Sequence, residues 1–200
     1  MQEINQIVEC LERGGVVLLP TDTVYGIAVK PNIESAVAQI YKLKSRPRNM
    51  FLPIMVSSID YFEGLGLNIS DNTNKLLNSN LVPGAITIAL GFNPTKQRPS
   101  WLDGRDEVAI RIPNDERLLS VLRMIGPLLV TSANKHGSNS TPNNLIEILD
   151  ELNGRPDLII DGGIKQEIPS TIINCRLNPP VIEREGYISS VQIFNILDNG

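Results

Sequence analysis

Apolar residues recur along this chain in two spacings, one typical of helices and one typical of buried strands. Between residues 4 and 11 they follow the i, i+3, i+4, i+7 spacing of an amphipathic helix, which the glycines at 14–15 end. A continuous apolar run at 16–19 then predicts a strand that is buried on both faces. The first part of the chain is therefore expected to be a helix followed by a buried strand.

The same two patterns continue through the rest of the chain. Asn32 is a candidate cap for a second helix, which we expect to end near Ser45, because Pro47 disfavours helical geometry in the residue before it. The pair Thr141-Pro142 favours the start of another helix, with a hydroxyl cap and a proline at the first helical position. Since strands alternate with helices, we predict an α/β fold with a mixed sheet covered by helices. Further strands are predicted over 52–56, 86–90, 108–112, 127–130, 158–160 and 181–182, and a further helix over 118–125.

Composition narrows the class of protein. Two hundred residues with 42% hydrophobic content can bury a substantial core, and we expect one domain over residues 1–200. The apolar runs are too short for a membrane span and the two cysteines lie far apart, so we expect a cytoplasmic protein without membrane association. A net charge of −4 opposes a stable nucleic-acid surface, although cations gather at 42–48 and 96–111.

Three polar segments stand where a ligand site is expected. Residues 20–26 and 131–134 each follow a predicted strand, and α/β folds bind ligands at the carboxyl ends of strands. The basic segment 42–48 closes the second helix, and an extended exit there would place Lys44 and Arg46 on one face, where they can neutralise a polyphosphate. We therefore predict a cleft for a small anionic ligand, most simply a nucleotide.

Taken singly, these features have plainer explanations. Lys44 and Arg46 could decorate a helix end, where cations favour the helix dipole, and Thr23 with Tyr25 could be simple strand-end packing. His136 is the only histidine and falls in a predicted loop, so a catalytic triad would have to be built on it alone. If the chain is an enzyme, we expect it to act by positioning and electrostatic stabilisation, without covalent catalysis.

In their order and spacing, the segments resemble the YrdC-type L-threonylcarbamoyladenylate synthase family over about residues 5–190. The resemblance implies a twisted mixed sheet flanked by helices around an open cleft lined by positive charge. It also implies a reaction in which L-threonine, bicarbonate or CO2, and ATP with Mg²⁺ give L-threonylcarbamoyladenylate and pyrophosphate. The matching stretches are Pro20-Thr-Asp-Thr-Val-Tyr-Gly26, Ile40-Tyr-Lys-Leu-Lys-Ser-Arg-Pro47, Pro83-Gly-Ala-Ile-Thr87, Val108-Ala-Ile-Arg-Ile-Pro113, Pro127-Leu-Leu-Val-Thr-Ser-Ala-Asn134, Ser170-Thr171-Ile172 and Arg184-Glu185-Gly186.

The resemblance assigns the nucleotide side of the site to two groups of residues. Arg48, Ser140 and Arg184 would make further contacts with ATP. Mg²⁺ would be held by the phosphates and by water, with no ligand from a protein side chain. The family's Lys-x-Arg and Ser-x-Asn residues, which would bind ATP and stabilise the transferring adenylyl group, fall on Lys44, Arg46, Ser132 and Asn134.

The resemblance also implies a threonine pocket. Arg111 would pair with the carboxylate of the amino acid, and the alternation along 108–112 places it on the face opposite to Val108 and Ile110. The residues implied for this pocket are Thr23, Tyr25, Arg111 and Ser170.

The family's product donates its threonylcarbamoyl group to adenosine 37 of tRNA through a separate transferase complex. We therefore expect a monomer that binds tRNA directly only weakly or transiently, and no additional C-terminal domain. One departure from the family is Met50, which stands where many members carry a lysine and for which Arg48 could substitute. Two alternatives stay open: a non-catalytic RNA- or nucleotide-binding relative, which the acidic charge disfavours for RNA, and a carbamoyl-adenylating module of the kind found in longer chains.

Overall fold

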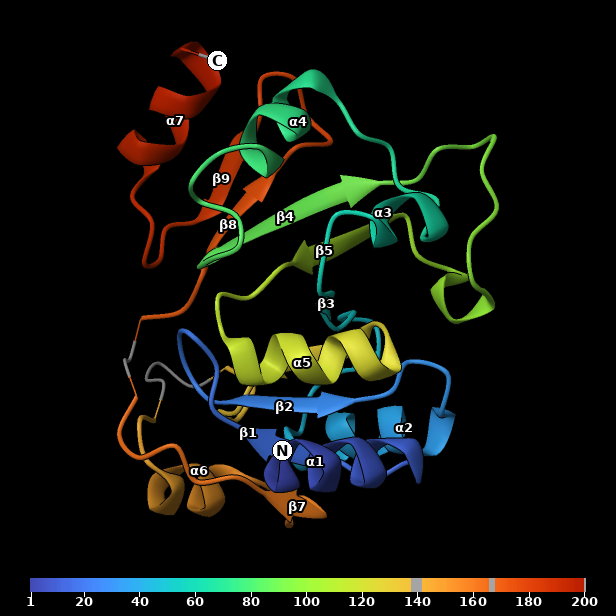
Figure 1. Ribbon diagram of the computed structural model, residues 1–200, viewed down its shortest axis with the longest axis vertical. Helices are drawn as coiled ribbons and strands as arrows, with labels where there is room; N and C mark the ends of the chain where they lie inside the picture. Colours follow the sequence, from blue (N-terminus) through green and yellow to red (C-terminus); the bar gives the residue numbers. More distant parts are fainter. Residues whose placement is uncertain (138–141, 166–167, 200) are drawn as a thin grey trace.

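The computed structural model describes residues 1–137, 142–165 and 168–199 and shows a twisted mixed sheet flanked by helices (Figure 1). This confirms the predicted fold class. Within the described residues, nine strands form one sheet in the order β7-β1-β2-β6-β3-β5-β4-β8-β9. The strands are β1 (Val17–Leu19), β2 (Gly26–Val29), β3 (Ile54–Met55), β4 (Ile86–Gly91), β5 (Glu107–Arg111), β6 (Leu128–Ser132), β7 (Leu158–Ile159), β8 (Thr171–Asn174) and β9 (Val181–Arg184).

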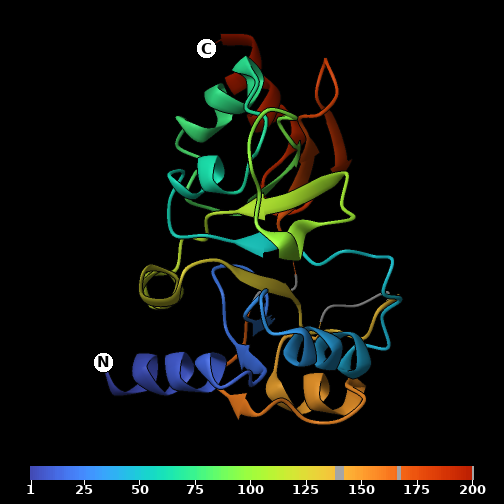
Figure 2. The same cartoon turned by 90° about the vertical axis from the view of Figure 1, so that its right-hand side faces the viewer.

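The described helices cover the sheet from both sides. They are α1 (Gln2–Glu12), α2 (Glu34–Leu43), α3 (Tyr61–Gly64), α4 (Asp71–Leu77), α5 (Glu116–Ile125), α6 (Leu145–Glu151), α7 (Ser190–Asn199) and the 3₁₀ helix η1 (Ser100–Leu102). Helices α1 and α5 contact each other on one face of the lower part of the sheet, and α2 and α6 lie on its other face (Figure 2). Within the described ranges, no helix combines the length and the apolar character that crossing a membrane would require.

Strand alternation divides the core into two parts. In β1, Leu18 packs with Ile40 of α2, whereas Val17 and Leu19 pack on the opposite face with Leu11 of α1. Each such side chain is fully buried, which contributes about 1.5–3 kcal/mol relative to an exposed position. The continuous apolar run therefore acts as predicted, as a strand covered on both faces.

Several predicted elements have different bounds in the structure. Asn32 does not cap α2, because Ile33 occupies the N-cap position without a side-chain cap bond. Helix α6 does not start at Pro142, because Asn144 is its N-cap and accepts the Glu147 N–H at 3.1 Å. Thr141 lies outside the described residues. By contrast, α5 ends as predicted at Gly126, whose φ of 80° suits glycine.

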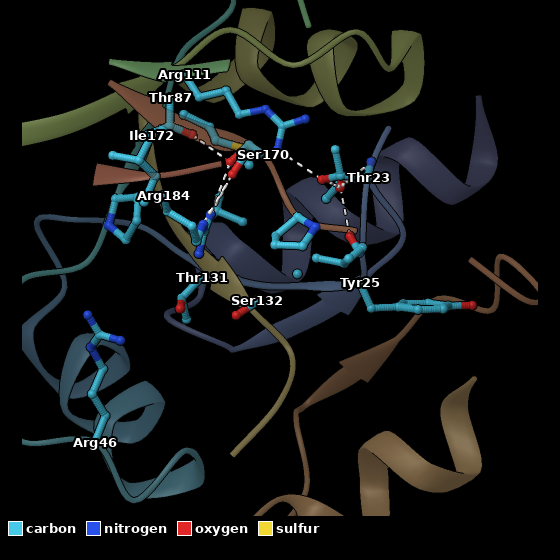
Figure 3. Close-up of a pocket in the computed structure, with 17 residues that line it drawn as sticks. Thr23, Tyr25, Arg46, Thr87, Arg111, Thr131, Ser132, Ser170, Ile172 and Arg184 are labelled. Atoms are coloured by element: carbon cyan, nitrogen blue, oxygen red, sulfur yellow. Dashed lines mark hydrogen bonds between the residues drawn. The ribbon is translucent and has the colours of Figure 1, made fainter. Parts of the chain in front are cut away.

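The pairing of the strands determines where the site forms. Strand β2 pairs antiparallel with both β1 and β6, and β5 pairs parallel with β3 and antiparallel with β4. Strand β4 in turn pairs parallel with β8. The start of β2 and the end of β6 face the start of β8 across the middle of the sheet, and the polar segments of the sequence meet there (Figure 3).

Candidate functional site

A pocket of about 190 Å³ lies between the two halves of the sheet (Figure 3). One side is formed by the connection between β1 and β2 and by the end of β6, and the other by β4, β5, β8 and β9. Seven residues that the sequence predicted for the site line this pocket: Thr23, Tyr25, Arg46, Arg111, Ser132, Ser170 and Arg184.

Arg111 is the most deeply buried cation of the pocket, with 5% of its surface exposed. It lies on the face of β5 opposite to Val108 and Ile110, as the alternation predicts. Its Nη2 forms an ion pair with Asp22 Oδ1 at 2.8 Å, and its Nη1 donates to Thr23 Oγ1 at 2.9 Å. Burial lowers the pKa of Arg111 from its usual value, and the carboxylate of Asp22 opposes that effect.

Arg184 brings a second positive charge to the same pocket. Its Nη2 and Nε donate to the backbone oxygen of Ser170, at 2.8 and 3.2 Å. Although Arg184 as a whole residue is exposed, partial desolvation of its guanidinium lowers its pKa, and so does the positive charge of Arg111. Two cations that disfavour each other's charge create a preference for an anion between them.

Hydroxyl groups complete the wall next to these arginines. Ser170 Oγ and Thr87 Oγ1 lie 2.8 Å apart and share a hydrogen bond. On the other side, Thr21 Oγ1 donates to the Val24 oxygen at 2.7 Å and accepts the Thr23 N–H at 3.1 Å, which fixes the turn before β2. The pocket therefore offers short donors and acceptors in fixed positions.

Tyr25 lines the pocket, but its hydroxyl points away from the arginines (Figure 3). That hydroxyl accepts the Gly162 N–H at 2.8 Å and donates to the Gly163 oxygen at 2.7 Å. Tyr25 therefore ties the segment after β7 to the start of β2, and its ring side rather than its hydroxyl is available to a ligand.

Lys44 and Arg46 do not leave α2 side by side, which corrects the predicted extended exit. Ser45 has a φ of 50°, the Arg46 N–H bonds the Tyr41 oxygen at 2.9 Å, and the Ser45 N–H bonds the Lys42 oxygen at 3.1 Å. This is a Schellman-type helix end, with a serine in the left-handed position that glycine usually takes. The turn directs Lys44 inward and leaves Arg46 at the pocket.

Lys44 is buried, with 2% of its surface exposed. Its Nζ donates to the backbone oxygens of Ser132 and Asn134 and lies 3.4 Å from Asn134 Oδ1. The pKa of Lys44 is lowered to about 7, mainly by burial and also by the positive charge of Arg46, while the negative charge of Glu151 opposes the shift. Lys44 therefore lies at the helix end, as predicted, but its side chain is in the core and does not line the described pocket.

The remaining predicted residues lie at different places around the pocket. Arg46 lines it, and its guanidinium donates to the backbone oxygens of Met50 and Phe51 at 3.0 and 3.1 Å. Asn134 is not among the described lining residues, but its Oδ1 accepts a hydrogen bond at 2.6 Å from Oγ of Ser132, which is. Arg48 is exposed and is not among the described lining residues, and Ser140 lies outside the described residues.

Sequence reasoning missed two residues that shape the site, Asp22 and Thr87. Both stand inside the motifs that carried the family resemblance, so their position was visible but their role was not. A carboxylate between two threonines could have been matched with the lone arginine of β5 on charge alone. Asp22 also accepts the Asn114 N–H at 2.9 Å, which links the β1–β2 connection to the segment after β5.

Comparison with known proteins places this geometry in a family. The model of the Sua5/YciO/YrdC family, described as telomere recombination, matches residues 9–186. The chain belongs to this family. It is 33% identical over 193 residues to the threonylcarbamoyl-AMP synthase of Bacillus subtilis, and covers 55% of that protein. It is also 33% identical over 186 residues to YciO of Escherichia coli, an uncharacterised protein of which it covers 88%.

A solved structure of the same family has a similar fold. Pyrococcus abyssi Sua5 in complex with L-threonine matches with a TM-score of 0.85 at 29% identity, covering 98% of this chain and 57% of that one. The chain therefore spans about half the length of the Bacillus and Pyrococcus relatives. The relatives from Bacillus subtilis and Pyrococcus abyssi are both named threonylcarbamoyl-AMP synthase.

Proposed function

We propose that this chain is an L-threonylcarbamoyladenylate synthase, which joins L-threonine, bicarbonate or CO2, and ATP and releases pyrophosphate. The observation that carries the proposal is the meeting of Arg46, Arg111 and Arg184 with fixed hydroxyls in one small pocket. Relatives named for this activity, and a Pyrococcus abyssi relative solved with L-threonine, support it.

The size and charge of the pocket suit an amino acid. Its 190 Å³ fall below the roughly 300–1,000 Å³ of pockets that hold drug-sized ligands. Arg111 and Arg184 bring two positive charges and Asp22 one negative, so one positive charge among these three remains to be matched by an anionic ligand. We place the threonine carboxylate at Arg111 and its hydroxyl near Thr23 or Ser170, and we assign Arg184 to the phosphates of ATP.

ATP is proposed to approach from the side of Arg46 and Ser132. Arg46 is partly exposed, so its guanidinium can contact phosphate oxygens without moving out of a core. Ser132 and Asn134 form one hydrogen-bonded pair at the end of β6 and would present their polar groups to the same phosphates. Magnesium would enter as the complex with ATP, held by phosphate oxygens and water.

The proposed chemistry needs no protein nucleophile. The threonine amine adds to CO2 and loses a proton, which gives a carbamate. A carbamate oxygen then attacks the α-phosphorus of ATP, the bond to the β-phosphate oxygen breaks, and pyrophosphate leaves. Arg46 and Arg184 would stabilise the charge on the phosphates, and the pocket would hold the carbamate in line with the leaving group.

The cellular role follows from the product. L-threonylcarbamoyladenylate is an activated donor, and we propose that a separate transferase complex uses it to modify adenosine 37 of tRNA. The chain itself would act as a cytoplasmic monomer with weak or transient contact to tRNA.

Pyrophosphate release tests the proposal. The purified chain is incubated with ATP and magnesium in four mixtures, with and without L-threonine and with and without bicarbonate. We expect release only when both are present, and L-alanine in place of L-threonine should give little. Release that is independent of threonine or bicarbonate would refute the proposed reaction.

A second candidate function is a non-catalytic nucleotide-binding relative. The observation that favours it is Lys44, whose ammonium is occupied by protein oxygens, together with the uncharacterised Escherichia coli YciO, of which this chain covers 88%. Under this alternative the folded chain binds ATP, but it releases no pyrophosphate in any of the four mixtures.

A further inference from the structure

Three segments that are distant in the sequence meet at the end of α2. The His136 N–H donates to the Lys44 oxygen at 3.0 Å, which attaches the loop after β6 to this helix end. The Asn153 N–H donates to the Leu43 oxygen at 2.8 Å, which attaches the end of α6 to the same place. The loop after β6 and the end of α6 are thus both attached to the end of α2.

Glu151, the last residue of α6, connects the other two segments directly. Its Oε2 accepts the Lys135 N–H at 2.9 Å, immediately after Asn134 in the chain. A carboxylate that accepts a backbone N–H makes a stronger hydrogen bond than a neutral acceptor does. The backbone on the far side of the Ser132–Asn134 turn is therefore fixed by a side chain that does not line the described pocket.

Lys44 fixes the near side of the same turn. An ammonium group has three N–H donors, and here three oxygens of Ser132 and Asn134 lie within reach. All three oxygens can be bonded only while Lys44 keeps its proton, because the neutral amine has two N–H donors. Burial and Arg46 oppose that charge, and the negative charge of Glu151 supports it.

We propose that Glu151 is a positioning residue for the reaction, because its carboxylate accepts the Lys135 N–H and so holds the Ser132–Asn134 turn. The proposal rests on the proposed function for its effect on catalysis. The hydrogen bond from the Lys135 N–H to Glu151, which we call the clamp, exists without substrate. Glu151 acts through other residues and is not among the described residues that line the pocket.

The charged groups that act on the Lys44 ammonium come from two elements. Arg46 follows it on its own segment, and Glu151 faces it from α6. The end of β6 contributes only oxygens, and the described part of the loop that bonds the Lys44 oxygen carries Lys135 and His136. A His136→Gln variant therefore separates any titration of His136 from that of Lys44.

The test compares Glu151→Ala and Glu151→Gln with Glu147→Gln, an exposed glutamate one turn earlier on α6. Amide hydrogen exchange in the full chain without substrate is the first measurement. We expect exchange at Lys135 to rise roughly tenfold or more in Glu151→Ala, which leaves that N–H without its charged acceptor. It should rise less in Glu151→Gln, which keeps an oxygen acceptor, and should not change in Glu147→Gln. An unchanged exchange rate at Lys135 in Glu151→Ala would overturn the clamp.

The second measurement is the pH profile of pyrophosphate release. Without the negative charge of Glu151, Lys44 loses its proton at lower pH, so the basic limb of the profile should move to lower pH in both Glu151 variants. The shift should persist when His136 is replaced by Gln. A profile identical to that of Glu147→Gln would refute the positioning role. If the wild type releases no pyrophosphate, the proposed function fails, while the exchange experiment still decides whether the clamp exists.

Discussion

The buried pair of Arg111 and Asp22 gives the sharpest test of the proposed threonine pocket. Arg111 is 5% exposed, and the Asp22 side chain is 10% exposed. Replacing Arg111 by Met removes the cation but leaves the carboxylate buried without its partner. Breaking a buried ion pair from one side costs about 3–5 kcal/mol, a large part of the roughly 5–15 kcal/mol that stabilise a domain.

A second substitution separates the fold from the site. In the double variant Arg111→Met with Asp22→Asn, no unpaired charge remains, and the asparagine oxygen can still accept the Asn114 N–H. We expect this variant to lose about 1–2 kcal/mol, because the Gly84 oxygen and the Thr23 hydroxyl lose their hydrogen bonds from Arg111. The coupling between the two positions should therefore be about 2 kcal/mol or more.

Urea unfolding followed by the fluorescence of Trp101, the chain's only tryptophan, measures these losses. If the free energy of unfolding falls by roughly 2 kcal/mol per molar urea, the unfolding midpoint of the single variant should lie about 2 M urea below that of the wild type. In the double variant, the threonine requirement for pyrophosphate release should rise at least tenfold while that for ATP stays nearly constant. Equal destabilisation of the single and double variants would refute the ion-pair argument, and an unchanged threonine requirement would refute the role of Arg111.

Three further predictions test other parts of the site. Tyr25→Phe should lower the free energy of unfolding by about 1–2 kcal/mol, because the Gly162 N–H loses its acceptor; urea unfolding that matches the wild type would contradict this. In the folded protein the pKa of Lys44 is about 7, below its usual 10.5, so between these pH values the unfolded state binds more protons and the free energy of unfolding rises with pH. From pH 7 to 8.5 the wild type should therefore gain about 1–2 kcal/mol of stability over Lys44→Met. Parallel curves of stability against pH for the two proteins would exclude this. Arg46→Ala should weaken ATP binding at least tenfold in a calorimetric titration, whereas replacing the exposed Arg48 by Ala should weaken it much less. Equal losses of affinity in the two variants would argue against a specific role for Arg46.

The periodic parts of the sequence predicted the fold well. Helices α1 and α5 and strands β1, β4 and β5 follow clear spacings and appear within a few residues of their predicted bounds. Strands β2 and β8 were not predicted, because each is short and directly follows a polar motif rather than a distinct apolar run. Their place in the sheet depends on pairing with strands far away in the sequence.

The site shows the same division between local pattern and distant contacts. Strand alternation correctly predicted the face of Arg111, because period two is a local property of β5. The burial of Lys44 was not predictable, since it depends on the left-handed Ser45 and on backbone oxygens almost ninety residues away. The direction of the Tyr25 hydroxyl likewise depends on Gly162 and Gly163, which no local spacing connects to it.

The most direct test of the proposed reaction follows the carbonate carbon. The chain is incubated with ¹³C-bicarbonate, L-threonine and magnesium-ATP inside an NMR spectrometer, and the ¹³C and ³¹P signals are recorded as the reaction proceeds. We predict a ¹³C carbonyl signal that is coupled to the phosphorus of the AMP group and that disappears when threonine is left out. Consumption of ATP without any labelled carbonyl attached to AMP would contradict the account.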